Sequence, residues 1–323
     1  MNTPKSTSIR TLSNEIVQNI ENKEGNKNLI PTGFQYLDED FGGLSLGELV
    51  VIGGRPGMGK SQFVINLVSN ICDREPILFF SYDLTPSTLT SRILSNRTGI
   101  AVNNIIQNQL VNSDINLIKL AAKQLENSKL FVSDIGVANV NQTIEIIKEH
   151  VELYNTKIVL IDYLQLLGIG KYNTGREAEI GHICRVLKMC AKELNISIVL
   201  LSQLSRAVET RGSSKKPQLS DLRDSGSIEQ IADKVWLLYR PEYYMIDELD
   251  DDDFTSTDCI LLLLVAKNKN GKNGVSYFKR NTNFTEFNSI KKPGDSFEFN
   301  EYRLSELQKP SFKELNNENE VPF

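Results

Sequence analysis

Short apolar runs rich in valine, isoleucine and leucine alternate along the chain with stretches whose apolar residues recur at helical spacing. Such runs, bounded by polar or glycine residues, are typical of strands buried on both faces of a sheet. They predict strands at Leu49–Gly53, Ile77–Ser81, Leu130–Val132, Ile158–Asp162, Ile198–Ser202, Lys234–Tyr239, Cys259–Ala266 and Val275–Phe278. The helical spacing predicts helices at Lys60–Ile71, Ser87–Asn96, Ile115–Asn127, Asn141–Asn155 and Glu177–Asn195. Because strands and helices alternate, we expect an α/β fold with a mostly parallel central sheet flanked by helices.

The two ends of the chain differ from this alternating middle. Residues 8–22 carry apolar residues at helical spacing and precede a polar segment, so we interpret residues 1–28 as a linker helix and polar linker. The alternating pattern begins near Leu29 and predicts one domain over residues 29–290. Beyond it the composition turns polar, which favours a disordered C-terminal tail over residues 291–323.

Composition narrows the class of protein. Of the 323 residues 40% are hydrophobic, and the net charge of -5 argues against a wholly basic surface but not against a local basic strip. The four cysteines show neither C-x-x-C pairing nor metal-ligand spacing, which indicates reduced thiols. The N-terminus does not resemble a signal peptide, and the longest apolar run, Ile260–Ala266, is too short to span a membrane. We therefore expect a soluble, cytoplasmic protein without a membrane partner.

One stretch carries the most specific signal in the chain. It reads Gly54-Arg55-Pro56-Gly57-Met58-Gly59-Lys60-Ser61. This stretch fits the phosphate-binding pattern G-x-x-x-x-G-K-[ST], and it stands between a predicted strand and a predicted helix, as that pattern requires. Glycines let backbone N–H groups approach phosphate oxygens, Lys60 adds a positive charge, and Ser61 offers a hydroxyl to Mg²⁺. The sequence thus predicts a site for a nucleoside triphosphate.

Two predicted strands lead into carboxylates. Asp162 ends the strand Ile158–Asp162, and we interpret it as a ligand of Mg²⁺ rather than as a helix cap. Asp83 follows the strand Ile77–Ser81, at a sheet edge where a carboxylate can orient the water that attacks a γ-phosphate. The other interpretation of Asp83 is local, because it closely precedes Thr85 and can cap the next helix.

A third strand end, at Gln203, leads into a basic stretch. Gln203 can bind the γ-phosphate and transmit its state, or it can merely satisfy a backbone group. The basic residues that follow it are Arg206, Arg211, Lys215, Lys216 and Arg223. A flexible basic loop can hold nucleic-acid phosphates without sequence preference, although a charged surface loop has the same composition.

In this order the motifs resemble the C-terminal motor domain of DnaB-type replicative helicases, a RecA-like P-loop ATPase. The matching segments are residues 31–38, 42–44, 161–165, 191–195, 201–206, 220–230 and 239–244, together with the phosphate loop. The resemblance covers roughly residues 8–290. It implies an ATP- and Mg²⁺-dependent DNA helicase motor that works as a hexameric ring on single-stranded DNA.

The resemblance also implies roles for single residues. The implied catalytic residues are Lys60, Asp83, Gln203, Lys267 and Lys269. The implied nucleotide-binding residues are Arg240 and the phosphate loop from Gly54 to Ser61. The implied DNA-binding residues are Arg223, Asp224 and Gly226, and we add Arg206 and Arg211 of the basic stretch as further candidates for DNA binding. Lys267 and Lys269 are expected to reach the nucleotide of a neighbouring subunit, and the helix over residues 8–22 is expected to dock on that subunit.

Three departures from the family pattern matter. Asp83 stands where the family usually has glutamate, which shortens the carboxylate side chain by one methylene. Lys269 stands at the arginine-finger position and lacks the planar fork of arginine. Both changes keep their charge, so we expect slower ATP hydrolysis rather than none. The family's N-terminal primase-interacting domain has no counterpart here, which favours a phage, plasmid or accessory version of the motor.

Two other functions stay open at this point. One is a RecA-like DNA-dependent ATPase, acting as a loader, recombination or defence factor that does not unwind DNA. The other is a catalytically weakened nucleotide-binding ring. The end of the chain, residues 316–323, resembles the acidic, Pro-Phe-ending tip by which bacterial single-stranded DNA-binding proteins dock on replication or repair partners, although a frayed end is the simpler interpretation.

Overall fold

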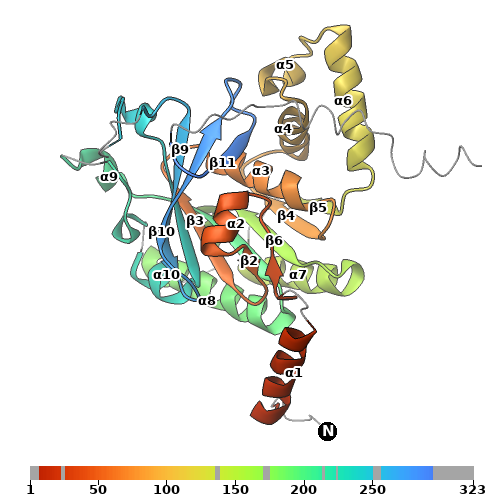
Figure 1. Ribbon diagram of the computed structural model, residues 1–323, viewed down its shortest axis with the longest axis vertical. Helices are drawn as coiled ribbons and strands as arrows, with labels where there is room; N and C mark the ends of the chain where they lie inside the picture. The colour runs from red at the N-terminus through yellow and green to blue at the C-terminus, as the bar shows by residue number, and fades with distance from the viewer. Residues whose placement is uncertain are drawn as a thin grey trace, which may run out of the picture.

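A nine-stranded sheet forms the centre of the computed structural model, which describes residues 7–22, 26–134, 139–169, 175–212, 215–222, 225–249 and 256–293 (Figure 1). The strand order is β11-β10-β9-β8-β3-β7-β6-β4-β5. The strands of this sheet are β3 (Leu49–Gly54), β4 (Ile77–Ser81), β5 (Leu130–Ser133), β6 (Ile158–Asp162), β7 (Ser197–Gln203), β8 (Lys234–Tyr239), β9 (Ile260–Asn268), β10 (Gly274–Arg280) and β11 (Phe287–Ile290). A separate small sheet pairs β1 (Leu29–Ile30) with β2 (Leu44–Ser45).

The six neighbouring strands β8, β3, β7, β6, β4 and β5 run parallel, whereas β9, β10 and β11 are antiparallel to their neighbours. Every residue of β3, β4, β6 and β8 is buried, as expected for strands covered on both faces. The register sets Gly54 opposite Gln203 and Ser81 opposite Asp162. The segments that follow these parallel strands therefore emerge at one edge of the sheet, where open α/β sheets bind ligands.

Helices cover both faces of the sheet (Figure 1). The helices of the described residues, including α1 that lies apart from the sheet, are α1 (Ile9–Glu21), α2 (Gln35–Phe41), α3 (Lys60–Ile71), α4 (Pro86–Thr98), α5 (Val102–Ile106), α6 (Asn112–Leu125), α7 (Val140–Tyr154), α8 (Arg176–Leu194), α9 (Ala207–Thr210) and α10 (Ser225–Ile231). Three single 3₁₀ turns are η1 (Leu164–Leu166), η2 (Leu219–Asp221) and η3 (Pro241–Tyr244).

Two apolar layers hold these helices to the sheet. One layer lies between the sheet and helices α2, α3 and α4; at its centre the ring of Phe63 lies 5.3 Å from that of Phe34 and 5.4 Å from that of Phe278. The other layer joins the opposite sheet face to α7, α8 and α10, and it includes Ile183 and Leu187 of α8. Successive side chains of each strand point into alternate layers, so β3, the strand that leads into the phosphate loop, is packed on both faces.

The predicted α/β architecture is confirmed. Each predicted strand and helix is present, with ends shifted by a few residues. The elements that periodicity did not predict are the short ones, among them α2, α5, α9, α10 and β11. Their apolar spacing extends over too few residues to stand out from a loop. The C-terminal Pro-Phe tip lies outside the described residues, and the proposed domain division remains a prediction.

Helix α1 projects away from the sheet (Figure 1). The side chain of Ser8 caps its first turn by accepting a hydrogen bond from the Arg10 N–H. No residue of α1 is buried, and its apolar residues Ile9, Ile16 and Ile20 are 80%, 60% and 70% exposed. An apolar stripe this exposed has no partner within the described part of the chain. None of the described helices is both long and apolar enough to cross a bilayer.

Candidate nucleotide-binding site

A cavity of about 580 Å³ lies at the carboxyl ends of β3, β4, β6 and β7. Its lining residues are Pro56, Gly57, Gly59, Lys60, Ser61, Gln62, Asp83, Arg92, Val102, Asp162, Tyr163, Gln203, Asn283 and Phe284. The fold thus brings together the phosphate loop and all three strand ends that the sequence marked as functional.

The phosphate loop needs glycine at two of its positions. Gly57 and Gly59 have φ angles of 81° and 85°, in the left-handed region that side chains rarely adopt. A Cβ on Gly57 would approach Tyr243 to 2.8 Å, and one on Gly59 would approach Phe284 to 3.0 Å. Helix α3 begins at Lys60, directly after this turn, so its unpaired N–H groups and positive dipole end face the cavity.

The side chain of Lys60 is held by backbone carbonyl oxygens of the phosphate loop. Its Nζ donates hydrogen bonds to the carbonyl oxygens of Gly54 at 2.8 Å and Arg55 at 3.2 Å. Burial lowers the pKa of Lys60 to about 8, and the nearby negative charge of Asp162 opposes that shift. A phosphate group entering the cavity would offer this ammonium a full negative charge in place of two carbonyl dipoles.

Ser61 and Asp162 form the second half of the site. The Ser61 hydroxyl donates a hydrogen bond of 3.0 Å to the Asp162 carboxylate, which is buried at the end of β6. Burial raises the pKa of Asp162, and the Ser61 hydrogen bond partly offsets this rise. Two oxygen donors this close suit a hard cation such as Mg²⁺, which keeps waters and phosphate oxygens as its other ligands. Among the described residues no group of three or more His, Cys, Asp and Glu side chains could hold a metal.

Asp83 lies on the rim of the cavity rather than at a helix cap. Thr85 caps α4 instead, because its hydroxyl accepts a hydrogen bond of 3.2 Å from the Thr88 N–H. This observation removes the capping interpretation of Asp83. The carboxylate is exposed and shares the cavity with Lys60 and Asp162.

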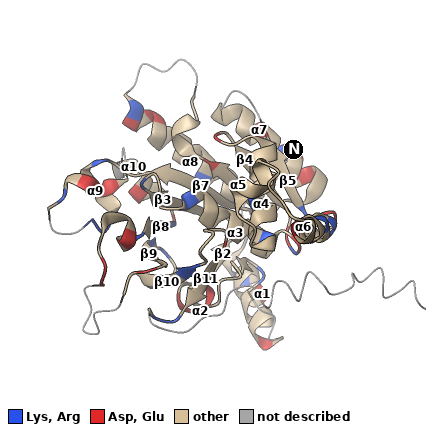
Figure 2. Ribbon diagram, turned by 90° about the horizontal axis from the view of Figure 1, so that it is seen from above, with Lys and Arg blue, Asp and Glu red and all other residues tan. Residues whose placement is uncertain are grey.

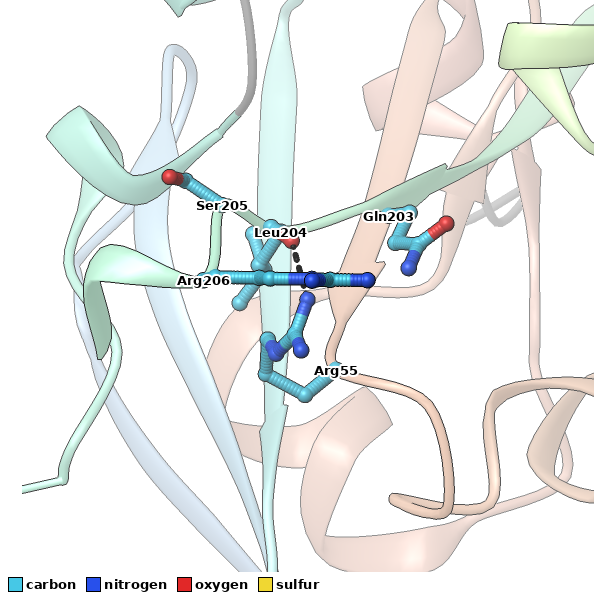
Figure 3. A pocket seen from close by; sticks show the side chains of 5 residues that line it. All are labelled: Arg55, Gln203, Leu204, Ser205 and Arg206. Carbon is cyan, nitrogen blue, oxygen red and sulfur yellow. Dashed lines mark hydrogen bonds between the residues drawn. The ribbon is translucent and has the colours of Figure 1, made fainter. Parts of the chain in front are cut away.

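Gln203 lies between the nucleotide cavity and a second cavity of about 590 Å³ (Figure 3). The second cavity is lined by Arg55, Gln203, Leu204, Ser205 and Arg206. The side chain of Gln165 holds the backbone of Gln203 by accepting a hydrogen bond of 3.2 Å from its N–H. Gln203 is thus placed between the nucleotide and the start of the basic stretch.

Two members of the phosphate loop point away from the nucleotide cavity. Arg55 donates to the Leu204 carbonyl oxygen, drawn as a dashed line in Figure 3, and it forms an ion pair of 2.8 Å with Glu209 of α9. Met58 is 1% exposed and packs in the core. Any contact of Met58 with a nucleotide must therefore come from its backbone.

Arg240, which follows β8, also contacts the phosphate loop. Its guanidinium donates a hydrogen bond of 2.9 Å to the Gly57 carbonyl oxygen, forms an ion pair with Glu242, and lies 4.3 Å from the centre of the Phe284 ring. Arg280 pairs with the same carboxylate at 2.9 Å. Although burial acts to raise it, the pKa of Glu242 is lowered by its hydrogen bonds, including those from both arginines. Arg240 therefore braces the loop turn.

Some of the basic side chains that follow Gln203 interact with other residues of the same segment. Arg211 forms an ion pair of 2.6 Å with Asp221, and the Lys215 ammonium donates to the carbonyl oxygens of Glu209 and Arg211, each at 2.6 Å. Arg206 is exposed on the rim of the second cavity. Figure 2 marks the positions of Lys and Arg in blue and those of Asp and Glu in red along the ribbon, and segments of both signs are spread over the described fold.

Of the remaining predicted DNA contacts, the structure describes Gly226 of α10. Gly226 is exposed in that helix. Arg223 and Asp224 lie outside the described residues.

Lys267 and Lys269 lie at the sheet edge opposite the phosphate loop. The end of β9 pairs Asn268 with Lys234, the first residue of β8, whereas the loop follows the last residue of parallel β3. Lys267 donates to the Glu229 and Ala232 carbonyl oxygens at 2.6 and 2.7 Å, around the end of α10. Lys269 is 66% exposed and lies 3.7 Å from an Asp233 oxygen. Neither lysine reaches the nucleotide cavity of its own chain.

Comparison with known proteins agrees with this geometry. Residues 30–289 match the family described as DnaB-like helicase C terminal domain. This chain belongs to that family. Its DnaB-like domain is 34% identical over 276 residues to the replicative DNA helicase DnaC of Bacillus subtilis, covering 84% of this chain and 58% of that protein. It is 36% identical over 244 residues to a probable plasmid replicative DNA helicase of Chlamydia psittaci, covering 75% and 51% of the two proteins.

Two solved structures show the same fold as the DnaB-like domain. One, described as an ATPase domain, gives a TM-score of 0.80 at 30% identity and covers 89% of this chain and 100% of that one. The other, a DnaB-like replicative helicase described with its interactions with primase, gives 0.77 at 30% identity and covers 89% and 68% of the two chains. The chain thus spans a little over half the length of the curated helicases it resembles.

Sequence reasoning did not assign a role to Gln62, Arg92, Val102, Tyr163, Asn283 or Phe284 of the DnaB-like cavity, and three of these lie far from the predicted motifs. Arg92 lies on α4, and Asn283 and Phe284 lie in the turn between β10 and β11. No strand-end or glycine-loop pattern marks these positions. The one signal in the sequence that could have pointed to Arg92 is its position as a charged residue in the helix that follows the strand Ile77–Ser81.

Proposed function

We propose that this chain is the ATP-driven motor of a DNA helicase that moves along single-stranded DNA during replication in the cytoplasm. The observation that carries the proposal is the convergence of Lys60, Ser61, Asp83 and Asp162 on one cavity at the strand ends. The family, whose named relatives are replicative helicases, supports the same function.

The residues of the cavity divide the work of ATP hydrolysis. The phosphate-loop N–H groups and Lys60 bind the phosphates, and Ser61 and Asp162 would hold Mg²⁺, which would supply positive charge to the phosphates. Asp83 orients the attacking water and accepts its proton. Gln203 contacts the γ-phosphate and transmits its loss to the segment that begins at Leu204.

We infer that the subunits form a hexameric ring with nucleotide sites between neighbours. Lys267 and Lys269 lie at the opposite ends of the strands from their own cavity, so the nucleotide that they would contact is that of a neighbour. The exposed apolar stripe of α1 supplies a second surface for joining subunits. Arg206, Arg211, Arg223, Asp224 and Gly226 are proposed to contact the DNA.

A DNA-dependent ATPase without helicase activity is the second candidate. The observation that favours it is the ion pair between Lys269 and Asp233, which offers Lys269 a partner within its own chain. Such a lysine stabilises the transition state less well than an arginine fork.

Hydrolysis in the presence and absence of single-stranded DNA tests the proposal. We expect DNA to raise the rate of ATP hydrolysis, and we expect Lys60→Ala to abolish it while the variant stays folded. A matched control is Lys119→Ala, an exposed lysine on α6, which should keep the full rate. An unmodified protein that binds ATP but never hydrolyses it would support the weakened nucleotide-binding ring instead.

A further inference from the structure

Lys267 has three hydrogen-bond partners at the C-terminal end of α10. Its Nζ donates to the carbonyl oxygens of Glu229 at 2.6 Å, Gln230 at 3.4 Å and Ala232 at 2.7 Å. Two of these oxygens belong to the last turn of α10, and the third belongs to the residue just beyond it. An ammonium group has three N–H donors, so three partners can occupy all of them. The contacts of Lys267 are thus directed at α10 of its own chain.

A β-bulge turns Lys267 toward α10. The pairing of β8 with β9 sets Trp236 opposite Val265. It then sets Val235 opposite Lys267, so Ala266 is an extra residue in β9. Trp236 and Val265 belong to the apolar layer that contains α3, whereas Val235 belongs to the layer on the α10 side of the sheet. Without the extra residue, Lys267 would lie on the same side as Val265, because side chains two residues apart in a strand share a face. The bulge therefore places Lys267 on the α10 side.

Helix α10 needs such a partner because it is short and ends abruptly. It has seven residues, too few for a helix that is stable without tertiary contacts. In a longer helix the Asp233 N–H would donate to the Glu229 carbonyl oxygen, but here it donates to the Leu49 carbonyl oxygen at 2.9 Å. Lys267 supplies a donor to Glu229 in its place, and its positive charge suits the negative end of the helix dipole. Lys267 thus fastens the end of α10 to β9.

Lys267 joins two segments to which the proposed function gives different roles. Gly226, a proposed DNA contact, lies in the first turn of α10. Lys269, proposed to reach a neighbour's nucleotide, follows the end of β9. We propose that Lys267 is a positioning residue that joins α10 to the β9–β10 hairpin, so that DNA bound at the start of α10 aligns Lys269 of the same subunit with the neighbour's nucleotide.

The inference rests on the proposed function and narrows it in one respect. Because α10 occupies the donors of Lys267, the direct contact with the neighbour's nucleotide falls to Lys269, which is 66% exposed. The two roles have different kinetic effects. Removing a contact to the nucleotide lowers ATP hydrolysis by the same factor with and without DNA, whereas removing a link between the DNA and the hairpin lowers mainly the rate with DNA.

The first test compares kcat for ATP at saturating single-stranded DNA with kcat in the absence of DNA. Lys267→Met keeps an unbranched side chain and removes all three donors. We expect it to lower the ratio of the two kcat values by about fivefold or more, while kcat without DNA stays within about twofold of the unmodified protein. Lys267→Arg restores a cationic donor and should recover most of the ratio. Lys269→Met is the matched control, and it should lower both kcat values and leave their ratio within about twofold.

Hydrogen exchange of the full chain tests the contact without any assay of activity. Lys267→Met should speed exchange of the α10 amides by about tenfold or more, because the last turn of α10 loses its charged donor. Lys269→Met should leave the exchange of these amides unchanged. Unchanged exchange of α10 in Lys267→Met would mean that Lys267 does not hold the helix, and it would overturn the inference.

Two kinetic results would also overturn it. Equal losses of kcat with and without DNA in Lys267→Met would place Lys267 on the nucleotide, and an unchanged ratio with both kcat values intact would leave it without a role in coupling. Unfolding of both Lys267→Met and Lys267→Arg below the assay temperature would make Lys267 a structural residue, which contradicts the inference. Failure of the proposed function differs from all of these, because the unmodified protein would then show no stimulation of ATP hydrolysis by DNA.

Discussion

Lys60 carries a buried charge that its ligand would stabilise. Burial lowers the pKa of this ammonium to about 8, and the Gly54 and Arg55 carbonyl oxygens hold it until phosphate arrives. Negative phosphate charge nearby favours the protonated form, so the pKa of Lys60 should be higher in the nucleotide complex than in the free protein. Nucleotide affinity should therefore be constant below about pH 8 and should fall above it.

The first prediction at this scale concerns protons taken up on binding. Above about pH 8 the free protein has lost part of the Lys60 proton, so ADP binding should take up a proton, and the Kd should rise by up to about tenfold per pH unit. Calorimetry in two buffers of different ionisation enthalpy measures this uptake. Lys60→Arg stays protonated throughout and should show none. Equal uptake in both proteins would assign the proton to another group.

Site residues could be predicted from the sequence where they belong to a short local pattern. The phosphate loop was readable because strand, glycines, lysine and hydroxyl are contiguous in sequence, and Asp162 because it ends an apolar strand. Asp83 kept two interpretations until Thr85 was seen to cap α4. Arg92 and Phe284 enter the cavity only through tertiary packing, which no short pattern records.

At the scale of elements, the turn between β10 and β11 is fixed by a buried amide network. Asn66 of α3 is 0% exposed; its amide nitrogen donates to the Thr285 carbonyl oxygen at 3.2 Å, and its carbonyl oxygen accepts at 2.9 Å from both the Asn96 side chain and the Phe287 N–H. The network ties α3 and α4 to the turn that presents Phe284 to the phosphate loop. Phe284 keeps a φ of 57° there.

Removing this network should lower stability. Asn66→Ala leaves buried donors without partners, so we expect the free energy of unfolding to fall by about 3 kcal/mol. Urea denaturation measures the change. Asn103→Ala on the exposed surface of α5 should stay within about 0.5 kcal/mol of the unmodified protein. A loss of the same small size for Asn66→Ala would mean that the network does not hold the turn.

Elements long enough to show a period were predictable, and short ones were not. Helices α3 and α7 and the buried strands stood out because several apolar residues repeat in each. Helix α10 is seven residues long and acquires its place from packing on α8, and β11 from pairing with β10. Their sequences alone do not distinguish them from loops.

At the scale of the whole molecule, we propose that a neighbouring subunit completes the nucleotide site. The phosphate loop and the lysines at the end of β9 lie at opposite edges of the same sheet. Stacking subunits head to tail would bring the lysine edge of one against the nucleotide cavity of the next, and repetition with rotation closes a ring. The exposed stripe of α1 gives such a ring a second contact. In such a ring, hydrolysis in one subunit would depend on the position of its neighbour.

Strand displacement from a forked DNA duplex tests the central claim most directly. We predict that the unmodified protein with ATP and Mg²⁺ releases the displaced strand, and that Lys60→Ala at the same concentration releases none. Omitting ATP should also stop release, because translocation draws on hydrolysis. DNA-stimulated ATP hydrolysis without any strand release would contradict the claim that this chain is a helicase motor and would leave a DNA-dependent ATPase in its place.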